Sequence, residues 1–268
     1  MKKIKIKVYI ISIIIIFLSF AFIPIASPPQ LYYIQSIFIF LIFLIGQLYI
    51  QLYSKINIQN HYRQLEILVP LMNDLNIIKK IPNTRGYAAS PDFLYVINQI
   101  IKEEKPKLIV EAGSGVSTLI ASYSIKKYNS DSKIISLDND EHYANKTISD
   151  ISNHNLEGFS QVIHAPLKKY NDQFIWYDIS KISSLDKIDF LIIDGPPSKG
   201  SKDARYPALS LLFDNLSEDA TIILDDSKRK MEQNVVKRWE QEFPGKFDYE
   251  YIDNDKGLYI IKKINKNK

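Results

Sequence analysis

Acidic residues and glycines follow several short apolar runs of the chain, and these residue types suit two kinds of chemistry. A carboxylate can accept both hydroxyl protons of a ribose, and it can also take a proton from a reacting hydroxyl. A pair of glycines lets the backbone approach a ligand closely. In chain order, the residues are Glu111, Gly113, Ser114 and Gly115 after the first run, Asp138 after the second, Asp194 after the fourth, and Asp225 and Asp226 after the fifth.

The apolar runs alternate with helical patterns, which is typical of a parallel sheet covered on both faces. We therefore expect a doubly wound, Rossmann-like α/β domain, in which the carboxyl ends of the strands form one ligand-binding edge. The residues named above should meet at that edge. The predicted strands are 107–112, 133–137, 161–164, 188–193 and 220–224, the predicted helices are 116–128, one from residue 140, 203–215 and 227–242, and residues 246–252 and 258–261 form a closing hairpin.

Two long uncharged segments precede this domain. As helices, residues 8–25 reach ~27 Å and residues 31–53 roughly 34 Å, against a hydrocarbon core of ~30 Å. The prolines of residues 24–30 favour a turn between them. We expect a transmembrane helical hairpin with both ends in the cytoplasm, because lysines precede the first span and Lys55 and Arg63 follow the second. A cleaved signal peptide and a buried helix pair are the weaker alternatives.

Residues 54–83 form a connector between the membrane hairpin (1–53) and the α/β domain (84–268). Apolar residues recur there at helical spacing, so we expect a helix, which Pro70 should kink or split. The spacing fits a helix packed on the domain and a helix lying on the lipid surface equally. The apolar positions are Leu65, Leu68, Met72, Leu75 and Ile78.

Charge and composition exclude several classes of function. The chain has 34 Lys and Arg and 30 Asp and Glu, but six of the bases lie before Glu66, which is the first acid. The remainder is close to neutral and offers no general field for nucleic acid, whose binding rests on phosphate neutralisation. The absence of cysteine excludes disulfides, thiolate zinc sites and a cysteine nucleophile.

The first half of the domain has the features of a nucleoside-binding unit. Gly113 and Gly115 precede a helix whose N-terminus favours negative charge, and Asp138 follows 25 residues after Gly113. A dinucleotide fingerprint would have a third glycine where Thr118 stands. This departure argues against NAD.

An ordered set of motifs resembles the class I S-adenosylmethionine-dependent methyltransferases. Motif I of that family is similar to residues 110–117 (VEAGSGVS), its acidic second-strand position to 136–138 (SLD), its fourth-strand motif to 190–197 (FLIIDGPP), and the strand after it to 220–226. The chain also resembles a bacterial subgroup of these enzymes, some of which are membrane-tethered. This second resemblance lies in residues 84–92 (TRGYAASPD), 194–197 (DGPP) and 204–209 (ARYPAL). The resemblance covers the chain from Thr84 to near its C-terminus.

The resemblance implies that the chain binds S-adenosylmethionine. Asp138 would hold the ribose of this cofactor. Many relatives carry an acid near the adenine, where this chain has Ala165 and Pro166, and Asn139 replaces an apolar residue that often packs on the adenine ring. The methionine part would be lined by Glu111, Gly113, Ser114, Gly115 and Ser117.

The chemistry that such a cofactor supports is an in-line displacement, to which alignment contributes most. A hydroxyl acceptor must also lose its proton, and we expect Asp194 to take it, with Asp226 as a second catalytic acid. Catechol-type relatives use acids at these strand ends to hold a divalent metal. Binding of Mg²⁺ by Asp194, Asp225 and Asp226 is therefore one hypothesis for these acids. The alternative is that Asp225 and Asp226 cap the helix that follows them.

The loop after Asp194 contains candidates for binding the methyl acceptor. Lys199, Arg205 and Tyr206 could hold an anionic or sugar acceptor, and a solvated basic loop is the alternative. Trp176 and Tyr177, before the fourth strand, are assigned to packing in preference to an acceptor pocket.

We expect methyl transfer to a hydroxyl of a sugar, a glycolipid or another small acceptor at the cytoplasmic face of the membrane. Two alternatives remain: a membrane-anchored nucleotide-sugar glycosyltransferase or NAD-dependent reductase, and a non-catalytic tethered binding module. Thr118 and residues 194–197 favour the methyltransferase over the first alternative, and the intact acids at the strand ends disfavour the second.

Overall fold

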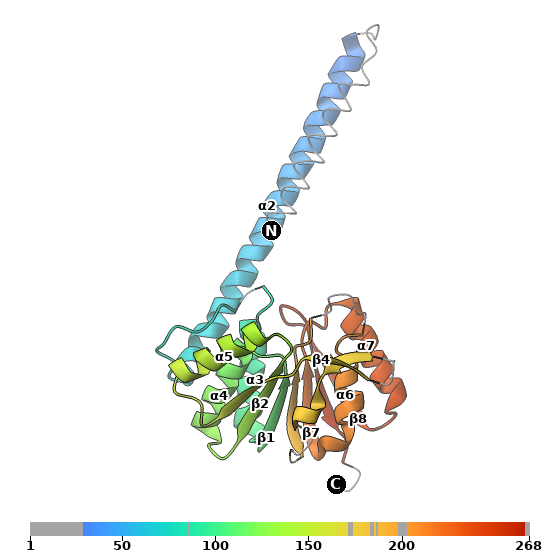
Figure 1. Cartoon of the computed structure of the whole chain (residues 1–268). Helices are drawn as coiled ribbons and strands as arrows, with labels where there is room; N and C mark the ends of the chain where they lie inside the picture. Colours follow the sequence, from blue (N-terminus) through green and yellow to red (C-terminus); the bar gives the residue numbers. More distant parts are fainter. Residues whose placement is uncertain are drawn as a thin grey trace. The chain divides into compact units, whose positions relative to one another are not determined.

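The computed structural model describes residues 29–84, 86–170, 174–182, 185, 187–197 and 203–265 (Figure 1). It divides into two units, Met1–Arg63 and Gln64–Lys268, and each is described by itself. The first predicted span (8–25), residues 24–28 of the predicted turn, and Lys199 lie outside the described residues.

Helix α2 spans Pro29–Asp74 and includes most of the second predicted membrane span. By length and composition, Ser36–Asp74 could cross a membrane: its most apolar window has a mean hydropathy of 2.0, and none of that window is buried. Ile37, Phe38 and Phe40 are all exposed. Successive helical residues are rotated by about 100°, so these side chains point in different directions and the segment is apolar on all sides.

The last turns of α2 belong to the second unit and pack on its core. Leu71 and Leu75 are buried there, and Gln64 Nε2 donates a hydrogen bond to Asp92 Oδ2 at 2.8 Å. The helix continues through the exposed Pro70, so of the two predicted outcomes, a kink or a split, the split does not occur. Burial of the two leucines offsets the hydrogen bond that a proline removes. From Gln64 onward the connector packs on the domain.

Helix α2 ends at Asp74, before the end of the predicted apolar stripe. Asn76 has a φ of 53°, a left-handed conformation that does not continue an α-helix. Ile78 is consequently 96% exposed instead of lying on a helix face. The helix end is fixed by the hydroxyl of Tyr128, which donates to Asp74 Oδ2 at 2.6 Å.

Seven strands form one sheet in the order β3-β2-β1-β6-β7-β9-β8. The first five strands of this order are parallel, whereas β9 is antiparallel to β7 and β8 is antiparallel to β9. The predicted doubly wound sheet and its closing hairpin are confirmed. The strands are β1 Leu108–Ala112, β2 Lys133–Asp138, β3 Ser160–His164, β6 Ile188–Ile193, β7 Leu216–Leu224, β8 Phe247–Ile252 and β9 Leu258–Lys263, and a separate hairpin consists of β4 Leu167–Tyr170 and β5 Phe174–Tyr177.

Helices cover both faces of this sheet (Figure 1). Side chains alternate along each strand, so Ile109 joins the core under α3 and α4, whereas Val110 joins the core under α6 and α7. The continuous apolar strands of the sequence follow from this double coverage. The helices are α3 Pro91–Glu104, α4 Val116–Tyr128, α5 Glu141–Asn153, α6 Pro207–Leu212 and α7 Lys230–Glu242, with 3₁₀ turns at Ile179–Ile182 and Phe213–Asn215.

Some elements differ from the prediction. Helix α6 is shorter than expected because its first turn begins at Pro207, and α7 begins at Lys230 instead of residue 227. Helix α3 and the β4–β5 hairpin were not predicted. The sequence does contain a start signal for α3, since Pro91 follows Ser90 and precedes apolar residues at three- and four-residue spacing.

Candidate active site

The carboxyl ends of β1, β2, β6 and β7 lie beside one another in the sheet. Ala112 is in register with Leu137 on one side and with Ile193 on the other, and Ile193 is in register with Leu224. The residues that follow these positions therefore occupy one edge, as the strand pattern predicts. They are Gly113, Asp138, Asp194 and Asp225.

The glycine loop between β1 and α4 needs glycine at two positions. Gly113 has a φ of 119° and Gly115 a φ of 154°, and both values are unfavourable for other residues. Gly113 also passes close to the neighbouring strand end, because a Cβ atom built on it would lie 3.6 Å from the carbonyl carbon of Asp194. The glycine loop after β1 therefore lies in contact with the backbone at the end of β6.

Glu111 is fully buried beneath this loop, and hydroxyl groups from two elements hold it. Its Oε2 atom accepts hydrogen bonds from Thr118 Oγ1 at 2.6 Å and from Ser136 Oγ at 2.5 Å, while Oε1 has no hydrogen-bond partner. Burial raises the pKa of Glu111. Thr118 also accepts a hydrogen bond from the Gly115 amide at 3.1 Å. Thr118, which stands where a dinucleotide fingerprint has its third glycine, therefore connects the loop to Glu111. The neighbouring Ser117 is buried.

Asp138 lies at the end of β2 and meets the glycine loop through Ser114. Ser114 Oγ donates to Asp138 Oδ2 at 2.6 Å, and the Asp140 amide donates to Asp138 Oδ1 at 3.0 Å. Burial raises the pKa of Asp138 despite these hydrogen bonds. Two residues that are 24 positions apart thus form one polar pair, as a nucleoside-binding unit requires.

The segment expected near the adenine lies beside Asp138. The amide of Ala165 donates to the carbonyl oxygen of Asp138 at 2.8 Å. Ala165 is buried, Pro166 is exposed and Asn139 is half-buried. These three residues therefore lie next to the proposed ribose contact and bring no charged group to it.

Three carboxylates converge at the ends of β6 and β7. Asp194, Asp225 and Asp226 each offer an oxygen within 4.8 Å of the others. Asp225 is fully buried, and neither of its carboxylate oxygens has a hydrogen-bond partner. Helix α7 begins at Lys230, and its N-cap residue is Arg229. Capping of this helix by Asp225 and Asp226, the alternative to a metal site, therefore does not occur.

Arg205 lies among these acids and is only 5% exposed. Its Nη2 atom contacts Asp226 Oδ2 at 2.7 Å and Asp194 Oδ1 at 3.2 Å, and it donates to the Asp194 carbonyl oxygen at 2.8 Å. Its Nη1 atom donates to the Asp225 carbonyl oxygen at 2.7 Å. The prediction that Arg205 holds the acceptor is therefore corrected: its guanidinium is engaged inside the protein, where it joins the ends of β6 and β7.

Tyr206, the neighbouring acceptor candidate, is also directed into the protein. Its hydroxyl donates to Glu242 Oε2 at 2.5 Å, the guanidinium of Arg238 lies 3.5 Å from its ring centroid, and its carbonyl oxygen accepts a hydrogen bond from Trp239 Nε1 at 2.9 Å. These contacts are all with α7. We therefore correct its predicted role to one of anchoring the turn that carries Arg205.

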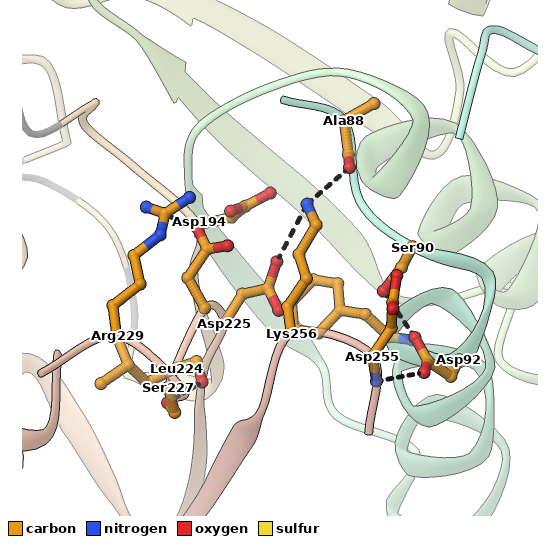
Figure 2. A network of polar contacts seen from close by, with 12 residues as sticks. Ala88, Ser90, Asp92, Asp194, Leu224, Asp225, Ser227, Arg229, Asp255 and Lys256 are labelled. Atoms are coloured by element: carbon orange, nitrogen blue, oxygen red, sulfur yellow. Dashed lines mark hydrogen bonds and ion pairs between the residues drawn. The ribbon is translucent and has the colours of Figure 1, made fainter. Parts of the chain in front are cut away.

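Lys256 connects the acid cluster to the segment before α3 (Figure 2). Its Nζ atom lies 3.9 Å from Asp225 Oδ2 and donates to the carbonyl oxygen of Ala88 at 2.8 Å. Next to it, the amide of Asp255 donates to Asp92 Oδ2 at 2.7 Å. The β8–β9 turn thus connects Ala88 and Asp92, which belong to one of the subgroup motifs, with Asp225 after β7.

Burial and mutual repulsion of the acids dominate the electrostatics of this cluster. Burial raises the pKa of Asp194 to about 6, with the Arg205 charge acting in the opposite direction. Burial and the charges of Asp194 and Asp226 also raise the pKa of Asp225 well above its usual range. A carboxylate that titrates near neutral pH is suited to accept a proton from a substrate.

Tyr177 reaches the same edge, although its sequence indicated packing. Its hydroxyl lies so close to Gly195 that a Cβ atom on that residue would clash with it. Tyr177 is fully buried, and burial raises the pKa of its phenol, to which the charges of Asp138 and Asp194 contribute. Only the tertiary structure identifies this contact, because nothing in the local pattern distinguishes Tyr177 from a core residue.

The acid cluster offers the oxygen ligands that Mg²⁺ prefers, but it already contains a cation. The guanidinium of Arg205 bonds to two of the three carboxylates and to both strand-end carbonyl groups. The residues present do not fit a divalent ion unless Arg205 is displaced.

The fold and this edge define a Rossmann-like α/β protein whose polar residues gather at the carboxyl ends of its strands. Residues 110–227 match a family described as a methyltransferase domain. This part of the chain is a methyltransferase domain. No curated protein matches the chain.

Several solved methyltransferases share this fold. An O-methyltransferase from Bacillus cereus in complex with SAH has 14% identity and a TM-score of 0.53, and the match covers 74% of this chain and 91% of that one. SAH-bound PaMTH1 from Podospora anserina has 14% identity and a TM-score of 0.52, covering 74% and 88%. The O-methyltransferase TomG from Streptomyces achromogenes, in complex with SAM, has 10% identity and a TM-score of 0.51, covering 75% and 89%.

Proposed function

We propose that the protein is a membrane-anchored O-methyltransferase that uses S-adenosylmethionine and acts on a hydroxyl of a small sugar-like or glycolipid-like acceptor. The observation that carries this proposal is the position of the Ser114–Asp138 pair and of Asp194 on either side of Gly113, with Ser114 Oγ 2.6 Å from Asp138 Oδ2. A site for the donor's ribose and a candidate base then lie on strand ends that flank one glycine loop.

Two features of the site and the similar solved structures support S-adenosylmethionine as the donor. Asp138 has the position and the acceptor atoms for two ribose hydroxyls, and Ser114 would give up its hydrogen bond to them. Glu111 has one buried oxygen without a partner, which suits the amino group of the donor. The similar structures from Bacillus cereus, Podospora anserina and Streptomyces achromogenes contain SAH or SAM.

Asp194 is the proposed base for the acceptor hydroxyl. The bound donor would supply a methyl group on a sulfonium, so the chain's own residues have to align the acceptor and remove its proton. A pKa of about 6 leaves Asp194 largely ionised at neutral pH, yet more basic than an ordinary carboxylate. Asp226 is held by Arg205 and by Arg229 Nη1 at 3.0 Å, so we assign it to positioning instead of proton transfer. Mg²⁺ is not part of this proposal.

The membrane anchor in this proposal consists of two helices, residues 8–25 and the apolar part of α2, with the catalytic domain in the cytoplasm. The exposed apolar side chains on all sides of α2 support the second helix. The lysines near the N-terminus and the bases after residue 53 support the orientation. Such an anchor raises the local concentration of an acceptor that also resides at the membrane. Lys199 remains a proposed acceptor contact.

The test is to incubate the purified full-length protein in mild detergent with methyl-labelled S-adenosylmethionine and with separated membrane and cytosolic extracts. We expect label in the lipid and glycolipid fraction of the membranes, and labelling that is slower by ~10²-fold or more with the Asp194→Asn variant. Label confined to soluble protein or nucleic acid would contradict the proposed acceptor and leave the methyltransferase activity intact. Calorimetry against S-adenosylmethionine, NAD and a UDP-sugar separately tests the donor.

A further inference from the structure

We infer that Arg205 is the permanent cation of the acid cluster, and that it positions Asp194 for proton transfer without a divalent metal ion. This inference rests on the proposed function, because it concerns the same base. Its structural basis is the four contacts of one guanidinium, two with carboxylates and two with the strand-end carbonyl groups of β6 and β7. A residue in this position fixes both the charge and the geometry of Asp194.

The charge balance of the cluster supports this assignment. Its carboxylates are the three acids of the strand ends and Glu232, which pairs with Arg229 at 3.7 Å. Its cations are Arg205, Arg229 and Lys256. The three cations therefore nearly balance the four carboxyl groups. A divalent ion would add an excess of positive charge to a buried site, where unpaired charge is costly.

The geometry also explains why the cation is arginine. A planar guanidinium has several donors in a fixed fork and stays charged at any physiological pH. Arg205 uses two nitrogens to bridge β6 and β7, and a lysine ammonium has only one nitrogen to place. Its backbone is held by the anchoring of Tyr206 on α7. Arg205 is therefore a positioning residue, because it acts through Asp194.

The experiment measures Mn²⁺ binding by electron paramagnetic resonance of the free ion, using the full-length protein in mild detergent. The variants are Arg205→Ala, Arg205→Lys and, as a control, Arg238→Ala, whose guanidinium lies on the ring of Tyr206 and pairs with Asp203 at 3.5 Å outside the cluster. We expect no Mn²⁺ binding by the wild type or by Arg238→Ala, and binding of one ion by Arg205→Ala, because only that variant frees the carboxylates. Mn²⁺ should also raise the melting temperature of this variant alone.

Turnover provides the second measurement. The wild-type rate should be unaffected by EDTA, and Arg205→Lys should lower kcat by about tenfold or more with the donor Kd within about twofold of wild type. One tightly bound Mn²⁺ in the wild type, or EDTA inactivation that Mg²⁺ reverses, would overturn the inference. If Arg205→Ala does not fold, the wild-type and Arg205→Lys results still decide. Absence of donor binding in the wild type would refute the proposed function, whereas the Mn²⁺ result would stand independently.

Discussion

At the scale of single residues, the proposed donor site depends most on Asp138. Replacing it with alanine removes the carboxylate that Ser114 and the Asp140 amide now hold, and with it the proposed ribose contact. Hydrogen bonds to a charged group are each worth ~1.5–3 kcal/mol, so the Kd for S-adenosylmethionine should rise roughly tenfold or more. Calorimetry on the full-length protein measures this change. Asp131→Ala, in an exposed turn, is the matched control, and equal affinity of both variants would remove Asp138 from the site.

Asp194 should affect turnover more than donor binding. The Asp194→Asn variant keeps the shape of the side chain and loses its charge, so we expect kcat to fall by ~10²-fold or more, as for the loss of a general base. The donor Kd should change little, because Asp138 and not Asp194 is the proposed donor contact. Asp203→Asn, on the same connection but exposed, should retain the wild-type rate.

The pH profile provides an independent check on the same residue. The pKa of Asp194 is raised to about 6 and the ionised form accepts the proton, so kcat should rise as the pH rises through about 6 and then level off. An inflection near the ordinary value for aspartate, or the same inflection in Asp194→Asn, would assign the base to another group.

At the scale of elements, the end of α2 is an integral part of the domain. Leu71 is 1% exposed and packs with α3, whereas Leu65, two turns earlier on the same helix, is 56% exposed. Leu71→Ala should lower the free energy of unfolding by about 2–5 kcal/mol, and Leu65→Ala by less than about 0.5 kcal/mol. Urea unfolding followed by tryptophan fluorescence reports on the domain alone, because both tryptophans, Trp176 and Trp239, are buried in it. Equal effects would show that α2 does not pack on the core.

The same packing has a practical consequence for fragments of the protein. A fragment that begins at Thr84 lacks Leu71 and Leu75 and exposes the α3 surface that they cover. It also loses the hydrogen bond from Gln64 to Asp92, which links α2 to the network around the β8–β9 turn. A soluble fragment therefore has to begin before Gln64.

At the scale of the whole molecule, the proposed topology places both termini in the cytoplasm. The lysines near the N-terminus, together with Lys55 and Arg63, lie on one side of the two proposed spans. A reporter fused after Lys268 should therefore be active only as a cytoplasmic fusion, and a reporter inserted within residues 24–30 should be active only as an external one. Periplasmic activity of the C-terminal fusion would contradict the topology and would separate the domain from a cytoplasmic methyl donor.

The sequence by itself determined the elements of the sheet and the edge at which the polar residues collect. Apolar runs of four to six residues between helical patterns have a local cause, the burial of both strand faces, so β1, β2 and β6 are found within about a residue of their predicted bounds. Gly113 and Gly115 are equally local, because their positive φ values are a property of the turn itself.

Tertiary structure decided which side chains meet at that edge. From the sequence, Arg205 could be a solvated loop residue. It is a buried cation between Asp194 and Asp226 because β6 and β7 are adjacent in the sheet. Tyr177, the last residue of β5, likewise meets Gly195 only because the fold places it beside the end of β6. Periodicity encodes whether a residue is buried, whereas its partner depends on which element lies next to it, and that is settled only when the strands are ordered in the sheet.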